Sequence, residues 1–196
     1  MNSDCFDKVI VSTDDPEIAE VGQAYGAAIP FMRPVELAND YAGTLPVIKH
    51  AIEWFEQNQT RPNNVCCIYA TAPFVQAETI KAAYQQLQDI DADYCFTVTS
   101  FPFPIQRAVK ITENQRLQMF YPDKFNTRSQ DLEKAYHDAG QFYWGRAEAF
   151  KAQKQLFSEA ASPYVLPGYL VQDIDTLEDW TRAEMMYQVI KRSGII

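Results

Sequence analysis

Short apolar segments alternate with helical segments along the first half of the chain, and this alternation constrains the fold more than any other feature. Apolar runs with strand character are at 8–12, 29–32, 65–69 and 94–100. Helical spacing of apolar residues, or helix start and stop signals, mark 16–25, 45–58 and 77–88. Such alternation predicts an α/β fold with a mostly parallel sheet. The continuous apolar run VCCIY is typical of a parallel strand that is buried on both faces.

The pattern changes after residue 100. RAVKIT and RLQMFY predict a short antiparallel hairpin, and the polar stretch 122–134 predicts a loop. We therefore expect an antiparallel insertion at about 101–136 in a single domain that spans 1–196. Beyond it we expect a strand in QFYWG, a short helix in RAEAFKAQ, one or two strands in VLPGYLVQDI and a final helix at 177–192.

Composition excludes several classes of protein. The formal charge is −9, from 17 basic and 26 acidic side chains, which disfavours nucleic-acid binding. No apolar run approaches the ~20 residues of a membrane span. The cysteines have no CxxC spacing and the chain has only two histidines, so a zinc site is not expected. These features predict a soluble protein of the reducing cytoplasm, with no membrane partner.

The stretch QDIDTLED carries the strongest chemical signal. If its first residues are extended, Asp173 and Asp175 project to the same side while Ile174 faces the core. Two carboxylates in this arrangement suit Mg²⁺, which prefers oxygen ligands. The alternative is structural, because Asp175 followed by Glu178 has the spacing of a capping box at the start of the last helix. Spacing alone leaves both roles open.

Other signals are weaker. Arg33 follows a strand-like segment and could bind a phosphate, or it could be a surface arginine. Thr44 and Asp15 are placed as helix N-caps. The small residues around Thr71 suit either close approach of a nucleotide or a plain turn. The seven glycines form no glycine-rich phosphate-binding motif, so these residues alone predict only an acidic α/β protein with a candidate Mg²⁺ site.

Five stretches together resemble one family. They are VIVSTDDPEIAEVGQAYGA, RPVELANDYAGT, IYATAPF, AYHDAGQFYWG and QDIDTLEDW. In this order they are similar to the CMP-sialic acid synthetase family of cytidylyltransferases, which activate nine-carbon 2-keto-3-deoxy sugar acids. IYATAPF and TRSQDLEKAYHDAGQFYW point to its pseudaminic acid branch. The resemblance implies a Rossmann-like nucleotidyltransferase fold with a small dimerisation insertion, CTP and a nonulosonic acid as substrates, Mg²⁺, and a homodimer.

The resemblance also assigns roles to residues. Asp173 and Asp175 match the metal-binding and catalytic pair, which favours the metal role over the cap. The nucleotide-binding positions correspond to Arg33, Thr44 and Thr71, and the positions that face the sugar acid correspond to Arg128 and Gln141. Tyr69 and Ala72 depart from the sialate pattern, in which Gln and Ser stand at these positions.

Family members begin with a strand and a GGSK-type loop that holds the triphosphate, and this segment is expected upstream of residue 1. The resemblance thus predicts a late-starting or truncated chain. Three alternatives stay open: CMP-sialate synthesis, CMP-legionaminate synthesis, and a non-catalytic homologue that only binds sugar or dimerises.

Overall fold

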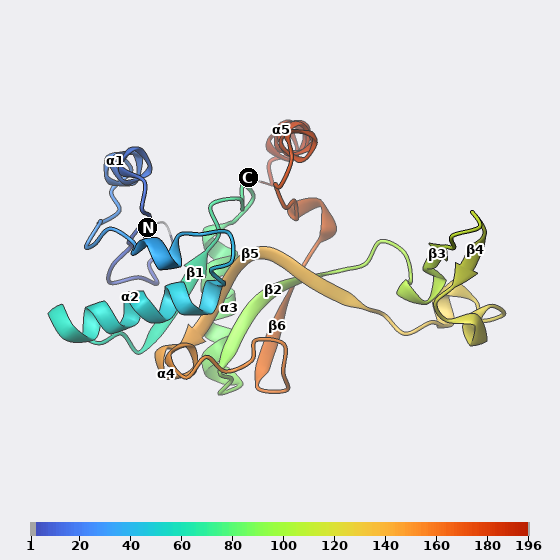
Figure 1. The fold of residues 1–196 in the computed structure, drawn as a ribbon, viewed down its shortest axis with the longest axis horizontal. Helices are drawn as coiled ribbons and strands as arrows, with labels where there is room; N and C mark the ends of the chain where they lie inside the picture. Colours follow the sequence, from blue (N-terminus) through green and yellow to red (C-terminus); the bar gives the residue numbers. More distant parts are fainter. Residues whose placement is uncertain (1–2, 196) are drawn as a thin grey trace. The chain divides into compact units, whose positions relative to one another are not determined.

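Figure 1 shows the fold of the computed structural model, which describes residues 3–195. The chain forms two compact units. Unit 1 comprises the described part of Met1–Tyr69 with Val75–Phe96 and Phe142–Tyr164. Unit 2 comprises Ala70–Phe74, Thr97–Gln141 and Val165–Ile196, of which the last residue is not described.

The helices agree closely with the sequence prediction. In unit 1 they are α1 (Pro16–Ala24), α2 (Thr44–Asn58), α3 (Ala77–Asp89) and α4 (Ala147–Lys151). In unit 2 the final helix is α5 (Leu177–Arg192). Short 3₁₀ turns occupy Val35–Leu37, Ile105–Arg107, Pro122–Lys124, Ser129–Asp131 and Gly168–Leu170. None of the helices in the described part of the chain is long and apolar enough to cross a membrane.

The strands form a four-stranded sheet and a separate hairpin. The sheet has the order β1–β5–β2–β6, with β1 (Asn64–Ile68), β2 (Tyr94–Ser100), β5 (Tyr136–Arg146) and β6 (Ala161–Leu166). The hairpin pairs β3 (Val109–Ile111) with β4 (Leu117–Met119) in antiparallel register, which confirms the hairpin predicted inside the insertion. Residues 171–175 continue without strand pairing, so VLPGYLVQDI holds one strand.

Two strand predictions were wrong in detail. The pairing of β1 with β5 is antiparallel, with Cys66 opposite Trp144, and the side chains of β1 are only partly buried. Segments 8–12 and 29–32 are not strands, because within the described residues they contribute one isolated bridge, between Ile10 and Ala28. Pro30 lacks the N–H that would extend this pairing.

The core of unit 1 lies between α3 and the sheet. Ile80, Ala83 and Leu87 recur at helical spacing on α3 and pack in one cluster with Cys95, Phe142 and Trp144. Trp144 donates its indole N–H to the carbonyl oxygen of Ile80 at 3.0 Å. β2 is rich in β-branched and aromatic residues and is buried over all but its last residue.

Two thiols of unit 1 with raised pKa values are Cys95, which is buried in this core, and Cys67, which is partly buried on β1. Burial raises the pKa of Cys95 to about 12, and burial raises the pKa of Cys67 to about 11, partly offset by the positive charge of Arg33. Both thiols are therefore protonated at neutral pH. They are not available as thiolate nucleophiles.

The raised pKa values of these thiols predict that the folded protein loses stability in alkaline solution. Above pH 9 the unfolded chain releases thiol protons that the folded chain retains, so the free energy of unfolding falls as the pH rises toward 11. We expect Cys95 to account for roughly 1–2 kcal/mol of the loss between pH 8 and pH 10.5. The decrease in the free energy of unfolding is measured by urea unfolding under reducing conditions at both pH values. The Cys95→Ala variant should lose less than the unsubstituted protein; an equal loss would contradict the assignment.

Candidate active site

Residues 171–176 of unit 2, called the acidic segment below, connect the 3₁₀ turn Gly168–Leu170 to α5. Its start is fixed to β5 because the buried side-chain amide of Gln141 donates to the carbonyl oxygen of Leu170. In the middle of the segment, Ile174 packs against the cluster of Phe74, Leu170, Ala183 and Ile190. The prediction that Ile174 faces the core is therefore confirmed.

The end of the segment is fixed by a capping box that the sequence prediction misplaced. The N-cap of α5 is Thr176, and its hydroxyl oxygen accepts from the N–H of Asp179 at 3.2 Å. The Asp179 carboxylate accepts in return from the N–H of Thr176 at 3.0 Å. Donation by the Thr176 hydroxyl holds the pKa of Asp179 below its usual value. The proposed cap by Asp175 with Glu178 is wrong by one residue, which leaves Asp175 outside the helix.

The two aspartates differ in their surroundings. One carboxylate oxygen of Asp173, Oδ1, accepts from the N–H of Ile174 at 3.1 Å, and the carbonyl oxygen of Asp173 accepts from the Gln172 amide at 2.7 Å. β5 passes close to this carboxylate at Gly140, which has no side chain to cover it. Asp175 makes no side-chain hydrogen bond or ion pair to other residues in the described chain.

Two carboxylates are the ligand type that a divalent cation shared with a substrate would use. Mg²⁺ is commonly held by one or two carboxylates, with waters and substrate phosphates as its other ligands. No cluster of three His, Cys, Asp or Glu side chains within residues 3–195 could enclose a metal by itself. The residues present therefore suit an open site, beside which Gly140 leaves room.

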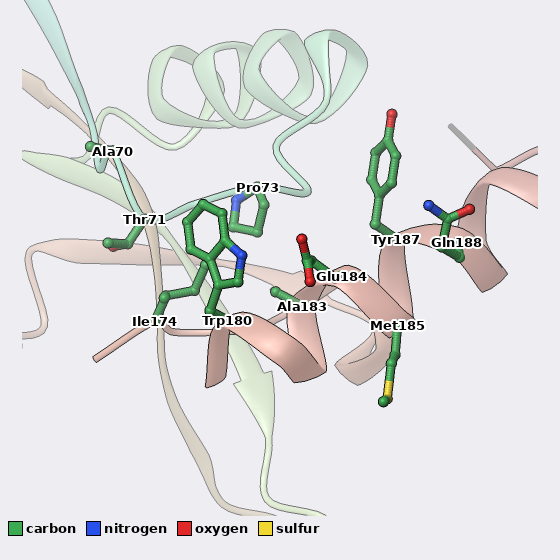
Figure 2. Close-up of a pocket in the computed structure, with 10 residues that line it drawn as sticks. All are labelled: Ala70, Thr71, Pro73, Ile174, Trp180, Ala183, Glu184, Met185, Tyr187 and Gln188. Atoms are coloured by element: carbon green, nitrogen blue, oxygen red, sulfur yellow. The ribbon is translucent and has the colours of Figure 1, made fainter. Parts of the chain in front are cut away.

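Thr71 lines a cavity of unit 2 that lies between the loop of residues 70–73 and α5 (Figure 2). The cavity has a volume of about 670 Å³, within the roughly 300–1,000 Å³ that is usual for small-molecule sites. Its lining residues are Ala70, Thr71, Pro73, Ile174, Trp180, Ala183, Glu184, Met185, Tyr187 and Gln188. In Figure 2 the indole of Trp180 lies near Pro73 and Ile174, and the ring is partly exposed.

Sequence reasoning missed the helix side of this cavity. Trp180, Glu184 and Gln188 stand four residues apart on α5, so they share one face of the helix. That spacing was the available signal, but it is also the spacing of an ordinary exposed face.

The remaining unit 2 positions have local partners. Arg128 lies at the start of the 3₁₀ turn Ser129–Asp131, and its Nε and Nη2 donate to the Asp131 carboxylate at 2.6 and 3.2 Å. This exposed pair is worth little stability, so Arg128 can exchange it for another anion at small cost. Gln141 is only 2% exposed, and its amide is bound to Leu170.

The two predicted nucleotide-binding residues of unit 1 are each held by a neighbouring segment. The Arg33 guanidinium donates to the hydroxyl and carbonyl oxygens of Ser12, and the Arg33 N–H donates to the carbonyl oxygen of Thr13 at 2.8 Å. Thr44 is the first residue of α2, whose N-cap is Gly43, so the predicted cap by Thr44 is wrong. The Thr44 hydroxyl is instead 2.6 Å from the Tyr69 hydroxyl.

Comparison with known proteins gives consistent results. The profile of a family described as cytidylyltransferase matches residues 1–179. Pseudaminic acid cytidylyltransferase from Campylobacter jejuni is 42% identical over 194 residues, which cover 99% of this chain and 84% of the relative. CMP-N,N'-diacetyllegionaminic acid synthase from Legionella pneumophila is 26% identical over 96% of this chain and 82% of its own length.

A solved structure of CMP:2-keto-3-deoxy-manno-octonic acid synthetase in complex with CTP shares the fold. The TM-score is 0.59, and the match covers 92% of this chain and 81% of that chain at 14% identity. The α/β nucleotidyltransferase fold class predicted from the sequence is confirmed. The profile match and the C. jejuni relative also confirm the predicted family. This chain belongs to the cytidylyltransferase family of nucleotidyltransferase enzymes.

Proposed function

We propose that this protein transfers CMP from CTP to a nine-carbon 2-keto-3-deoxy sugar acid and releases pyrophosphate, with pseudaminic acid as the acceptor. The observation that carries the proposal is 42% identity to a pseudaminic acid cytidylyltransferase over nearly the whole chain. Lower identity to a legionaminic acid synthase supports the class of acceptor but does not favour legionaminic acid. The four free thiols fit a reducing compartment, so the proposed location is the cytoplasm.

The reaction is a phosphoryl-type transfer. The anomeric hydroxyl oxygen of the acid forms a bond to the α-phosphorus of CTP, and the bond from that phosphorus to the oxygen that bridges to the β-phosphorus breaks. Pyrophosphate leaves with the bridging oxygen, and the hydroxyl proton passes to water. Such transfers depend on positioning and on neutralisation of charge rather than on covalent intermediates. Thiols whose pKa is raised to about 11 and about 12 agree with a mechanism without a cysteine nucleophile.

Each predicted residue has a proposed role in this reaction. Asp173 and Asp175 would hold Mg²⁺, which supplies neutralisation of the phosphate charge when it is bound. Arg33 and Thr44 would contact the nucleotide. Thr71 would contact it as well, a role supported by its place in the wall of the cavity.

Arg128 and Gln141 remain the proposed residues for the sugar acid. Arg128 can offer its guanidinium to the acid's carboxylate by releasing Asp131. Gln141 would act from its buried position by holding the acidic segment, because its amide is bound to Leu170.

The choice of acceptor can be measured directly. Pyrophosphate release by the purified chain is followed with CTP, Mg²⁺ and, in parallel, pseudaminic, legionaminic or sialic acid. We expect kcat/KM at least tenfold higher with pseudaminic acid than with the other two. A higher kcat/KM with another acid would contradict the assigned acceptor, and a folded chain inactive with all three would favour the non-catalytic alternative.

The roles of the aspartates are separable from helix capping. Asp173→Asn and Asp175→Asn should each lower kcat by at least about 100-fold, because each removes a charge proposed to hold the cation. The matched control is Asp179→Asn, which should lower stability slightly by weakening the capping box and leave kcat within about threefold. Equal losses of kcat in all three variants would contradict the metal role.

We also propose that the enzyme is a homodimer joined through the β3–β4 hairpin. Ile111 and Leu117 are directly opposite each other in the hairpin and are 68% and 73% exposed. Val109 and Met119 form the neighbouring pair on the same face. Apolar pairs of this kind, on a hairpin that pairs with no other strand in the described part of the chain, suit a self-complementary contact with a second copy.

The dimer has a simple test. Light scattering after size exclusion should give about twice the chain mass of 22.4 kDa. Ile111→Ser with Leu117→Ser should give the monomer mass. The control Val189→Ser, which changes an exposed apolar residue of α5, should stay dimeric. A monomeric unsubstituted protein would refute the proposal.

A further inference from the structure

Gly140 is an unusual residue within β5. Its φ of +61° lies in the left-handed region, which residues other than glycine rarely adopt inside a strand. The bend is held by Asp138, whose carboxylate Oδ1 accepts from the Gly140 N–H at 2.9 Å. A glycine with positive φ distorts the pleat locally, and such distortions are common beside active sites.

The space beside Gly140 is bounded by the Asp173 carboxylate. A Cβ placed on Gly140 would be 3.7 Å from Cγ, Oδ1 and Oδ2 of Asp173 alike. Three equal distances put that Cβ over the face of the carboxylate rather than at its rim. The contact is not a clash, because 3.7 Å is an ordinary van der Waals separation. The space at 140 therefore admits a Cβ, although the positive φ strains any residue other than glycine there, and that Cβ would cover the carboxylate.

Gly140 does not use this closeness to bind Asp173. Its N–H is committed to Asp138, and Oδ1 of Asp173 accepts from the N–H of Ile174. Because Gly140 has no side chain, it leaves free space beside the Asp173 carboxylate. By comparison, a Cβ on Gly168 would be 3.8 Å from the Thr99 hydroxyl, and a Cβ on Gly194 would have no heavy atom within 4 Å.

We propose that Gly140 is a positioning residue of the transfer site, whose missing side chain keeps the Asp173 carboxylate open to a divalent cation and its water and phosphate ligands. The proposal rests on the function proposed above. Mg²⁺ demands near-octahedral geometry and keeps several waters, so a carboxylate that binds it needs free space beyond the metal–oxygen contact. A carboxylate binds a cation in or near its own plane, so a methyl group over the face would displace waters and phosphate oxygens that complete the octahedron rather than the cation itself.

The test compares two glycines that share backbone strain but differ in surroundings. Gly140 and Gly194 have φ of +61° and +71°. Each is changed to Ala and, separately, to Asn, which tolerates positive φ better than Ala does. Binding of Mn²⁺, as a paramagnetic substitute for Mg²⁺, is measured on the full chain without substrates by electron paramagnetic resonance. Asp173→Asn serves as the reference, and circular dichroism monitors folding.

We expect Gly140→Ala to weaken Mn²⁺ affinity at least fivefold, and Gly140→Asn to weaken it at least as much. Both Gly194 variants should stay within twofold of the unsubstituted chain. If backbone strain alone lowered the Mn²⁺ affinity, Gly140→Asn would lose less affinity than Gly140→Ala, because Asn tolerates positive φ better. If Gly140→Ala does not fold, Gly140→Asn decides the question by the same fivefold threshold.

The outcomes separate this proposal from the proposed function. If Asp173→Asn loses Mn²⁺ while the folded Gly140 variants retain it, the role of Gly140 is overturned and the function stands. If Asp173→Asn binds Mn²⁺ as well as the unsubstituted chain does, the metal role of Asp173 is wrong and the inference about Gly140 is overturned with it.

Discussion

The buried amide of Gln141 is the contact on which the acidic segment depends. By donating to the carbonyl oxygen of Leu170, it ties the start of that segment to β5, and the Thr176–Asp179 capping box ties its end to α5. Between these fixed points Ile174 is anchored in the core, so the aspartates on either side have little freedom to turn inward. A buried amide is costly to leave unpaired, which makes this contact a strong local constraint.

Much of the fold could be predicted from local sequence signals. α1, α2, α3 and α5 follow from apolar spacing and from start and stop residues, and the β3–β4 hairpin follows from its two short runs. The direction of β1 could not be predicted, because an apolar run such as VCCIY records burial but not the partner strand. The pairing of 8–12 with 28–30 cannot extend through Pro30, which has no N–H and lies in a different segment.

The candidate site was predictable only in part. The pair Asp173 and Asp175 is visible in QDID, and the resemblance favoured its metal role before the structure placed the helix cap at Thr176. The approach of Gly140 to Asp173 was not predictable, because it joins positions 33 residues apart through the bend of β5. The Thr44–Tyr69 contact is also long-range, and nothing near either residue signals it.

The proposed function requires that the segment carrying Asp173 and Asp175 bind the divalent cation of a cytidylyl transfer. The most direct measurement is a crystal structure with CTP and Mn²⁺, in which anomalous scattering locates the ion. We expect a peak about 2.1 Å from carboxylate oxygens of both aspartates, with phosphate oxygens and water completing the octahedron. A peak held by other side chains, with Asp173 and Asp175 unliganded, would contradict the claim.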